Sequence, residues 1–219
     1  MNDEKMSQLE LHTLYLRNMQ RIKRRMRAIS DVWTGQLTTT YKQTNIEFCV
    51  LQIRKILELI ALSSLVSDTD IYKEKLDNIE KMWNARIIFR DIERIHPDFY
   101  PCPIQIDKDN ISEWNDQHKP YLTRAEFVRV YERCGKFLHE DSSYKTDKQI
   151  QEEYEAVWKD IGYWGELITN LLSNHVIHLY NQKDLFFISM NKDDGPPHGN
   201  IFTRVMEEHF NGQNENGVR

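Results

Sequence analysis

The chain has 219 residues, of which 40% are hydrophobic and 29% are charged, and its net charge is −5 at pH 7. This composition suits a globular protein with one good-sized core and argues against a disordered chain. The acidic balance excludes a protein that coats nucleic acid with its whole surface, although a phosphate-binding face needs only a few well-placed cations.

The sequence lacks the marks of a membrane or secreted protein. No apolar run approaches the roughly 20 residues that cross a bilayer, and the charged N-terminal segment has no apolar signal core. Cys49, Cys102 and Cys134 are odd in number and form no CxxC motif, which indicates reduced thiols rather than a disulfide framework. We therefore expect a soluble cytoplasmic protein with no membrane partner.

Residues 6–30 are predicted to form the first helix. An apolar stripe recurs at spacings of three and four residues, formed by Tyr15, Met19, Ile22, Met26 and Ile29. Its other faces carry six cations with no acid among them: Arg17, Arg21, Lys23, Arg24, Arg25 and Arg27. This basic side is either a solvated face or a phosphate-binding surface, and the stripe itself is also compatible with dimerisation.

Residues 45–66 are apolar on nearly every face, which predicts a central, buried helix. Glu47, Arg54 and Glu58 are nevertheless spaced at i, i+7 and i+11, in one line along this helix. A buried charge costs several kcal/mol unless it is paired. We expect this charged line to meet polar groups from elsewhere in the chain.

The next segments are predicted as a third helix over about residues 70–95 and an irregular, proline-rich insertion over 97–120. Thr123 and Glu126 have the spacing of a capping box, so a helix begins there and its apolar pattern ends at His139. A long helix is predicted over residues 147–180.

The sequence pattern after residue 180 changes from helical to strand-like. DLFFISM and IFTRVME indicate two strands around a turn-rich loop, a β-hairpin within residues 181–210, and residues 211–219 are predicted to be a disordered tail. We predict a mainly α fold, with a helical domain over residues 1–180 and the hairpin as an appendage.

Two histidines suggest a metal site, which we consider the weaker interpretation. His175 and His178 are spaced i, i+3 on the predicted helix and could meet at one ion, but no acid nearby in sequence completes the set. Polar positions on a long helix explain them as well. His96 and Cys102 have even less support as ligands, so we predict no metal and no cofactor.

The sequence contains no phosphate loop, dinucleotide fingerprint, zinc-protease motif or nucleophile elbow. The segment with the most informative chemistry is YERCGKFLHED, residues 131–141, which contains Arg133 and His139. It resembles the Arg-x(4–6)-His motif of the HEPN superfamily, compact α-helical domains of which many are metal-independent ribonucleases. The resemblance extends over residues 44–66 and 121–180.

Metal-free RNA cleavage gives such a pair a chemical reason. A base whose pKa lies near neutrality must take the proton of the 2′-hydroxyl, and imidazole fits that task. Negative charge gathers on the phosphoryl oxygens in the transition state, where arginine offers a permanent forked cation. Arg90/His96 and Arg204/His209 have similar spacing, but Arg133 and His139 close a capped, strongly periodic helix.

The resemblance implies a HEPN-like core over about residues 44–180 and a metal-independent endoribonuclease that acts on RNA as a homodimer. It further implies a toxin or antiphage-defence effector, with an antitoxin or another protein as a partner. Arg133 and His139 would be catalytic, and the supporting or substrate-binding residues would be Glu47, Arg54, Glu58 and Lys136.

A second interpretation is a non-catalytic helical binding or scaffold module that engages a protein or nucleic-acid partner. Inactive HEPN domains of this kind exist, and Cys134 stands where many HEPN nucleases carry a polar residue. Arg133 would then pair with a neighbouring carboxylate, and His139 would be a polar helix terminus. The exposed edge of the hairpin would recruit a partner strand.

Overall fold

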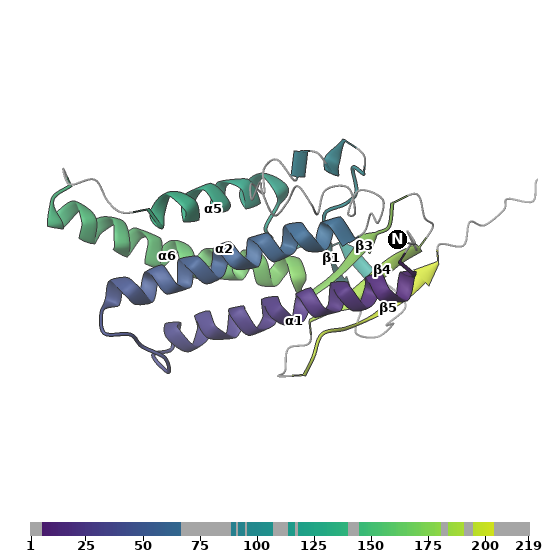
Figure 1. The fold of residues 1–219 in the computed structure, drawn as a ribbon, viewed down its shortest axis with the longest axis horizontal. Coiled ribbons are helices and arrows are strands. Elements are labelled where there is room, and N and C mark those ends of the chain that lie inside the picture. The colour runs from purple at the N-terminus through teal and green to yellow at the C-terminus, as the bar shows by residue number, and fades with distance from the viewer. Residues whose placement is uncertain are drawn as a thin grey trace, which may run out of the picture.

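The computed structural model describes residues 6–66, 89–90, 92–94, 96–106, 114–116, 118–139, 145–180, 184–190 and 195–203. This part of the chain is mostly helical, with a small antiparallel sheet at one end of the helices (Figure 1). The described long helices are α1 (Gln8–Trp33), α2 (Lys42–Val66), α5 (Arg124–Phe137) and α6 (Asp147–Leu172). The predicted C-terminal tail and most of the helix predicted over 70–95 lie outside the described residues.

Helix α2 is the central helix, as its sequence predicted. It contacts α1, α5 and α6, and α1 and α5 lie on opposite sides of it in Figure 1. Ile53, Ile56, Leu57 and Ile60 are fully buried because apolar residues occupy nearly its whole circumference. The stripe of α1 supplies Tyr15, Met19 and Ile22 to the same core.

Capping boxes start three of these helices. Ser7 caps α1, Thr123 caps α5 and Thr146 caps α6, and in each case the residue at N3 bonds back to the cap. Such reciprocal hydrogen bonds satisfy backbone donors that the helix itself leaves unpaired. The box predicted from Thr123 and Glu126 is therefore confirmed.

The described strands form one sheet in the order β2-β1-β3-β4-β5, with all neighbours antiparallel. Their bounds are Cys102–Ile106 (β1), Trp114–Asp116 (β2), Asn174–His178 (β3), Asp184–Ser189 (β4) and His198–Thr203 (β5). The sheet packs against the start of α1, where the rings of His12 and Phe186 meet edge to face at 5.0 Å.

The predicted hairpin is confirmed as β4 and β5, but it is not a separate appendage. Strand β3 pairs with β4 along five residues, from Asn174 opposite Ser189 to His178 opposite Leu185. The helix predicted to reach residue 180 therefore ends at Leu172. The β-branched pair Val176 and Ile177 favours a strand, and pairing with β4 supplies the backbone partners that a helix would otherwise provide.

The segment predicted as an irregular insertion over 97–120 contains β1 and β2. Four prolines and several turn-forming residues predicted an irregular connection here. Proline in particular cannot donate a backbone hydrogen bond to a neighbouring strand. The structure accommodates Pro103 by dividing the pairing of β1. Cys102 and Pro103 face β3, whereas Ile104 and the two residues after it face β2.

Candidate active site

Helix α5 contains Arg133 of the Arg-x5-His pair, and His139 follows its C-terminal end. Its buried side is formed by Phe127, Val130, Tyr131 and Cys134. The helix closes at Leu138, whose N–H donates to the Cys134 carbonyl at 3.1 Å. His139 follows directly and is exposed. Within the described part of the chain, no side-chain hydrogen bond or ion pair occupies its imidazole.

Arg133 is held by an acid of α6. Its Nη1 donates to Oε1 of Glu153 at 3.3 Å, and Nζ of Lys145 donates to Oε2 of the same carboxylate at 2.5 Å. The side chains of Arg133 and Glu153 are 32% and 22% exposed, so the guanidinium is both restrained and accessible. Two cations, Arg133 and Lys145, therefore share the carboxylate of Glu153.

Sequence reasoning missed Glu153 and Lys145. The available signal was position: Glu153 precedes Tyr154 on the inner side of a predicted helix, and Lys145 stands just before that helix begins. Which acid reaches which base across two helices depends on their packing, and the sequence pattern does not encode it.

The structure does not join Arg133 to His139 directly. No hydrogen bond or ion pair connects the two in the described residues, where Arg133 pairs with Glu153 instead. Six residues advance an α-helix by about 9 Å. A bound group that touches both side chains must therefore span the last turn of α5.

The side chain of Arg54, on α2, contacts α5. Its Nη2 donates to the hydroxyl of Tyr131 at 3.1 Å, and its guanidinium carbon lies 4.5 Å from the centroid of that ring. Its Nε lies 3.5 Å from Oε1 of Glu58, and Oε2 of the same carboxylate accepts from Nζ of Lys55. A Cβ atom at Gly135 would fall 2.6 Å from Nη1, so a residue without a side chain lets Arg54 lie against α5.

Glu47 lies on α2 near its N-terminal end, seven residues before Arg54. It accepts a hydrogen bond from the hydroxyl of Tyr154 on α6, and the Tyr154 ring meets Phe137 of α5 at 4.9 Å. The prediction that the charged line meets polar groups from elsewhere is confirmed for Arg54 and Glu47, which contact Tyr131 and Tyr154. Glu58 instead pairs with Arg54 and Lys55 of α2 itself. The line does not gather at one point, since Glu47 and Glu58 are about 16 Å apart along the helix.

Lys136, the remaining predicted residue, and Cys134 lie on the same helix but differ in exposure. Lys136 is exposed in the last turn of α5. Cys134 is fully buried, and burial raises the pKa of its thiol to about 12 although Arg54 and Arg133 act in the opposite direction. The thiol is therefore neutral at physiological pH and unsuited to nucleophilic attack.

The two histidines considered as metal ligands are on strand β3, not on a helix. Residues three apart on a strand point to opposite faces, so His175 and His178 cannot share an ion. His175 is fully buried: the hydroxyl of Tyr15 lies 2.8 Å from its Nε2, and the Leu172 carbonyl 3.0 Å from its Nδ1. Among the described residues, no group of three or more His, Cys, Asp or Glu side chains is arranged to hold a metal.

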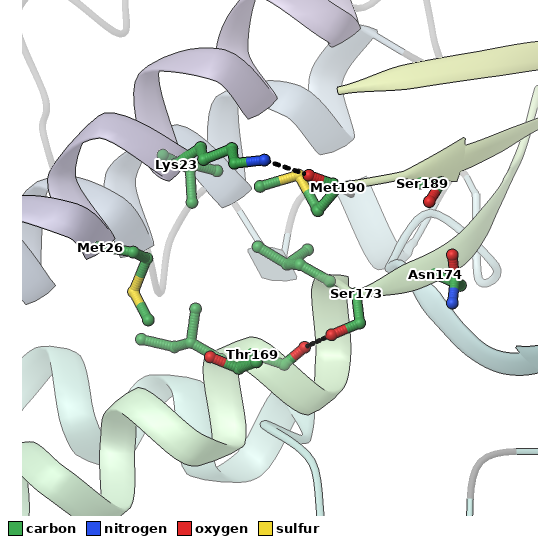
Figure 2. Close-up of a pocket in the computed structure, with 10 residues that line it drawn as sticks. Lys23, Met26, Thr169, Ser173, Asn174, Ser189 and Met190 are labelled. Carbon is green, nitrogen blue, oxygen red and sulfur yellow. Dashed lines mark hydrogen bonds between the residues drawn. The ribbon is translucent and has the colours of Figure 1, made fainter. Parts of the chain in front are cut away.

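A cavity of about 480 Å³ lies away from this site, between α1, α6 and the paired strands β3 and β4 (Figure 2). Ile22, Met26, Ile168, Leu172 and Met190 give it an apolar wall. Lys23 closes one side by donating to the carbonyls of Met190 and Gly195 at 2.8 and 2.7 Å. Its size falls within the range of small-ligand sites, but no residue of the predicted pair lines it.

No model of a known protein family matches the chain, and neither does any curated protein or solved structure. In the described part of the chain, no helix is both long and apolar enough to cross a membrane.

Proposed function

We propose that this chain is a metal-independent endoribonuclease of the HEPN type, with Arg133 and His139 as its catalytic residues. The observation that supports this most directly is the exposed imidazole of His139 at the end of α5, one and a half turns beyond a guanidinium that Glu153 restrains. A general base must be accessible to its substrate, and a cation that is already held loses less entropy when phosphate binds.

The reaction uses no metal and no cofactor. The 2′-hydroxyl of a ribose attacks the adjacent phosphorus while the neutral imidazole of His139 takes its proton. Arg133 offsets the charge that develops on the non-bridging oxygens. The bond from phosphorus to the 5′-oxygen breaks and that oxygen takes a proton, leaving a 2′,3′-cyclic phosphate and a 5′-hydroxyl. A second copy of the chain, across a two-fold interface, supplies the acid for that last proton.

The other predicted residues act around this pair. Arg54 and Glu58 hold α5 against the central helix through Tyr131, and Glu47 holds α6 through Tyr154. Lys136 is exposed between the two residues of the pair and attracts the RNA backbone. An enzyme of this kind fits a toxin or an antiphage effector whose activity is restrained by an antitoxin or another protein.

The test is cleavage of end-labelled RNA in EDTA by the wild type, Arg133→Ala and His139→Ala. Matched controls are Arg129→Ala, an exposed arginine one turn earlier on α5, and His118→Ala, an exposed histidine outside this helix. We expect cleavage to survive chelation and to fall by about 10²–10⁴-fold in the two site variants only. Undiminished cleavage by a folded His139→Ala variant would exclude His139 as the base.

The exposed outer strand favours a second candidate, a binding module. Strand β5 is the last strand of the sheet, and Ile201 and Phe202 on it are 37% and 42% exposed. A strand edge of this kind can add a strand from a partner protein. This candidate predicts no cleavage by the wild type, and a bacterial growth phenotype that His139→Ala leaves unchanged.

A further inference from the structure

Three arginines of α1 form one exposed line along the helix. Arg17, Arg21 and Arg24 are spaced at i, i+4 and i+7, so they share a face and span about 10 Å along the axis. All three are exposed, whereas the opposite side of α1 buries Tyr15, Met19 and Ile22 completely. We call these three residues the arginine face.

Among the residues that the structure describes, the arginine face has no partner. None of its three side chains forms a hydrogen bond or an ion pair with a residue that the structure describes. Two other cations of the same helix are used within the fold. Lys23 donates to the carbonyls of Met190 and Gly195, and Arg25 donates to Oε1 of Gln52 at 2.6 Å.

This arrangement carries an electrostatic cost that no ion pair among the described residues offsets. Like charges at i, i+3 and i, i+4 on a helix are destabilising by about 0.2–0.5 kcal/mol per pair. The chain as a whole has a charge of −5, and the six cations between Arg17 and Arg27 contribute +6, so the rest of the chain carries −11. No acid lies between Glu10 and Asp31. The positive charge is therefore concentrated on one helix of an otherwise acidic protein.

The exposed side of α6 is an ordinary solvated face, and its charges are arranged differently from those of the arginine face. There Lys148 and Glu152 pair at i, i+4, and Gln151 donates to Glu155 in the same way. A face that serves only solubility mixes both signs in this manner. All the charges on the arginine face are positive, which is typical of a surface that binds a polyanion.

The surroundings of the arginine face indicate which polyanion fits. An amphipathic helix that binds a lipid surface needs an exposed apolar side, and that of α1 is buried in the core. A protein interface is usually anchored by large apolar or aromatic side chains. The exposed large hydrophobic residues of α1 are Leu9 and Trp33, near its two ends rather than among the arginines. A phosphate backbone needs no such anchor, and arginine forks match phosphate oxygens.

We propose that Arg17, Arg21 and Arg24 bind the phosphate backbone of RNA. The identity of this polyanion as RNA rests on the proposed function, whereas the existence of an anion-binding face rests on the residues of α1 themselves. Because α1 and α5 lie on opposite sides of α2, an RNA that contacts both the arginine face and the pair on α5 must extend around the helices.

The first test measures RNA binding without cleavage. The parent is His139→Ala in EDTA, titrated into a fluorescein-labelled single-stranded RNA of mixed sequence and followed by fluorescence anisotropy at several salt concentrations. The test variant adds Arg17→Gln, Arg21→Gln and Arg24→Gln. The matched control adds Arg129→Gln, Lys148→Gln and Lys159→Gln, three exposed cations on other helices, and so removes the same net charge.

We expect the test variant to raise Kd at least tenfold at low salt, while the control changes it less than threefold. The slope of log K against log salt should become shallower by about 2, because each phosphate contact to a single strand contributes about 0.7. Equal losses in the test variant and the control, or no loss in either, would overturn the proposal. Binding to anionic phosphatidylserine vesicles through these arginines, with no binding to RNA, would overturn it as well.

A second measurement separates this inference from the proposed function. With His139 intact, the triple arginine variant should raise KM for RNA cleavage and leave kcat unchanged. A wild type that cleaves nothing, beside a parent that binds RNA through the arginine face, would overturn the enzyme and retain the binding surface. Unchanged binding and unchanged KM in the arginine variant of an active enzyme would retain the enzyme and overturn the surface.

Discussion

The guanidinium of Arg54 occupies the space that a side chain at Gly135 would need, because a Cβ atom there would lie 2.6 Å from Nη1. Alanine is better than glycine inside a helix by up to about 1 kcal/mol. Gly135→Ala should nevertheless change the free energy of unfolding by less than about 0.5 kcal/mol, because it displaces Arg54 from Tyr131 and loses a cation–π contact worth about 0.5–1 kcal/mol.

The matched background is Arg54→Ala, in which the space beside Gly135 is empty. There the glycine substitution should gain the full helix-propensity effect of about 1 kcal/mol. Urea unfolding of the four proteins gives the coupling between the two positions. The same gain in both backgrounds would show that Arg54 does not depend on Gly135.

Alanine substitutions at two further glycines should change the free energy of unfolding in opposite directions. A Cβ atom at Gly199 on β5 would fall well inside contact distance of the Phe187 carbonyl oxygen, whereas no atom of the described residues lies within 4 Å of one at Gly165 on α6. Gly199→Ala should lower the free energy of unfolding by about 1–3 kcal/mol, and Gly165→Ala should raise it by up to about 1 kcal/mol. Urea unfolding of both variants measures this contrast, and a loss at Gly165 as large as that at Gly199 would contradict it.

The parts of the fold that the sequence predicted correctly depend on local chemistry. The start of α5 follows from Thr123 and Glu126, since a capping box is complete within four residues. The central position of α2 follows from its apolar circumference, and the need to satisfy Arg54 and Glu58 follows from their burial cost.

The parts that it predicted wrongly depend on distant partners. His175 and His178 continue the three- and four-residue spacing of α6, so the end of that helix at Leu172 carries no clear local signal such as glycine or proline. Pairing with β4 decides the structure there. The acid that restrains Arg133 was missed for the same reason, because Glu153 meets it only when α5 and α6 are packed together.

The three cysteines should differ in reactivity. Burial raises the pKa of Cys49 to about 11 and that of Cys134 to about 12, whereas Cys102 is exposed on β1. At pH 8 about one molecule in a thousand or fewer carries either buried thiol as the reactive thiolate. Iodoacetamide should therefore label Cys102 alone in the native protein and all three thiols in urea, as peptide mass spectrometry would show. Native labelling of Cys134 as fast as that of Cys102 would contradict the buried position of α5.

The buried pair Tyr15 and His175 should make the fold sensitive to acid. His175 is neutral in the core, where its Nδ1 donates to the Leu172 carbonyl and its Nε2 accepts from the Tyr15 hydroxyl. Burial lowers its pKa from 6.5 to about 4. The unfolded chain therefore binds a proton below pH 6.5 that the folded chain does not, so stability is complete above pH 6.5 and falls as the pH falls toward 4. The loss over this window is about 3 kcal/mol.

Urea unfolding from pH 8 to pH 4.5 of the wild type, His175→Gln and the exposed control His118→Gln measures this term. His175→Gln should be less stable at pH 8 because it weakens the bond to Tyr15, but its stability should fall less steeply below pH 6.5. A residual slope is expected from His12, whose pKa burial also lowers. The carboxyls of Glu10 and Asp184, whose pKa values hydrogen bonds lower, affect stability only below about pH 4.5. If the wild type and His175→Gln lost stability in parallel between pH 6.5 and 4.5, the acid sensitivity would lie elsewhere than in the Tyr15–His175 pair.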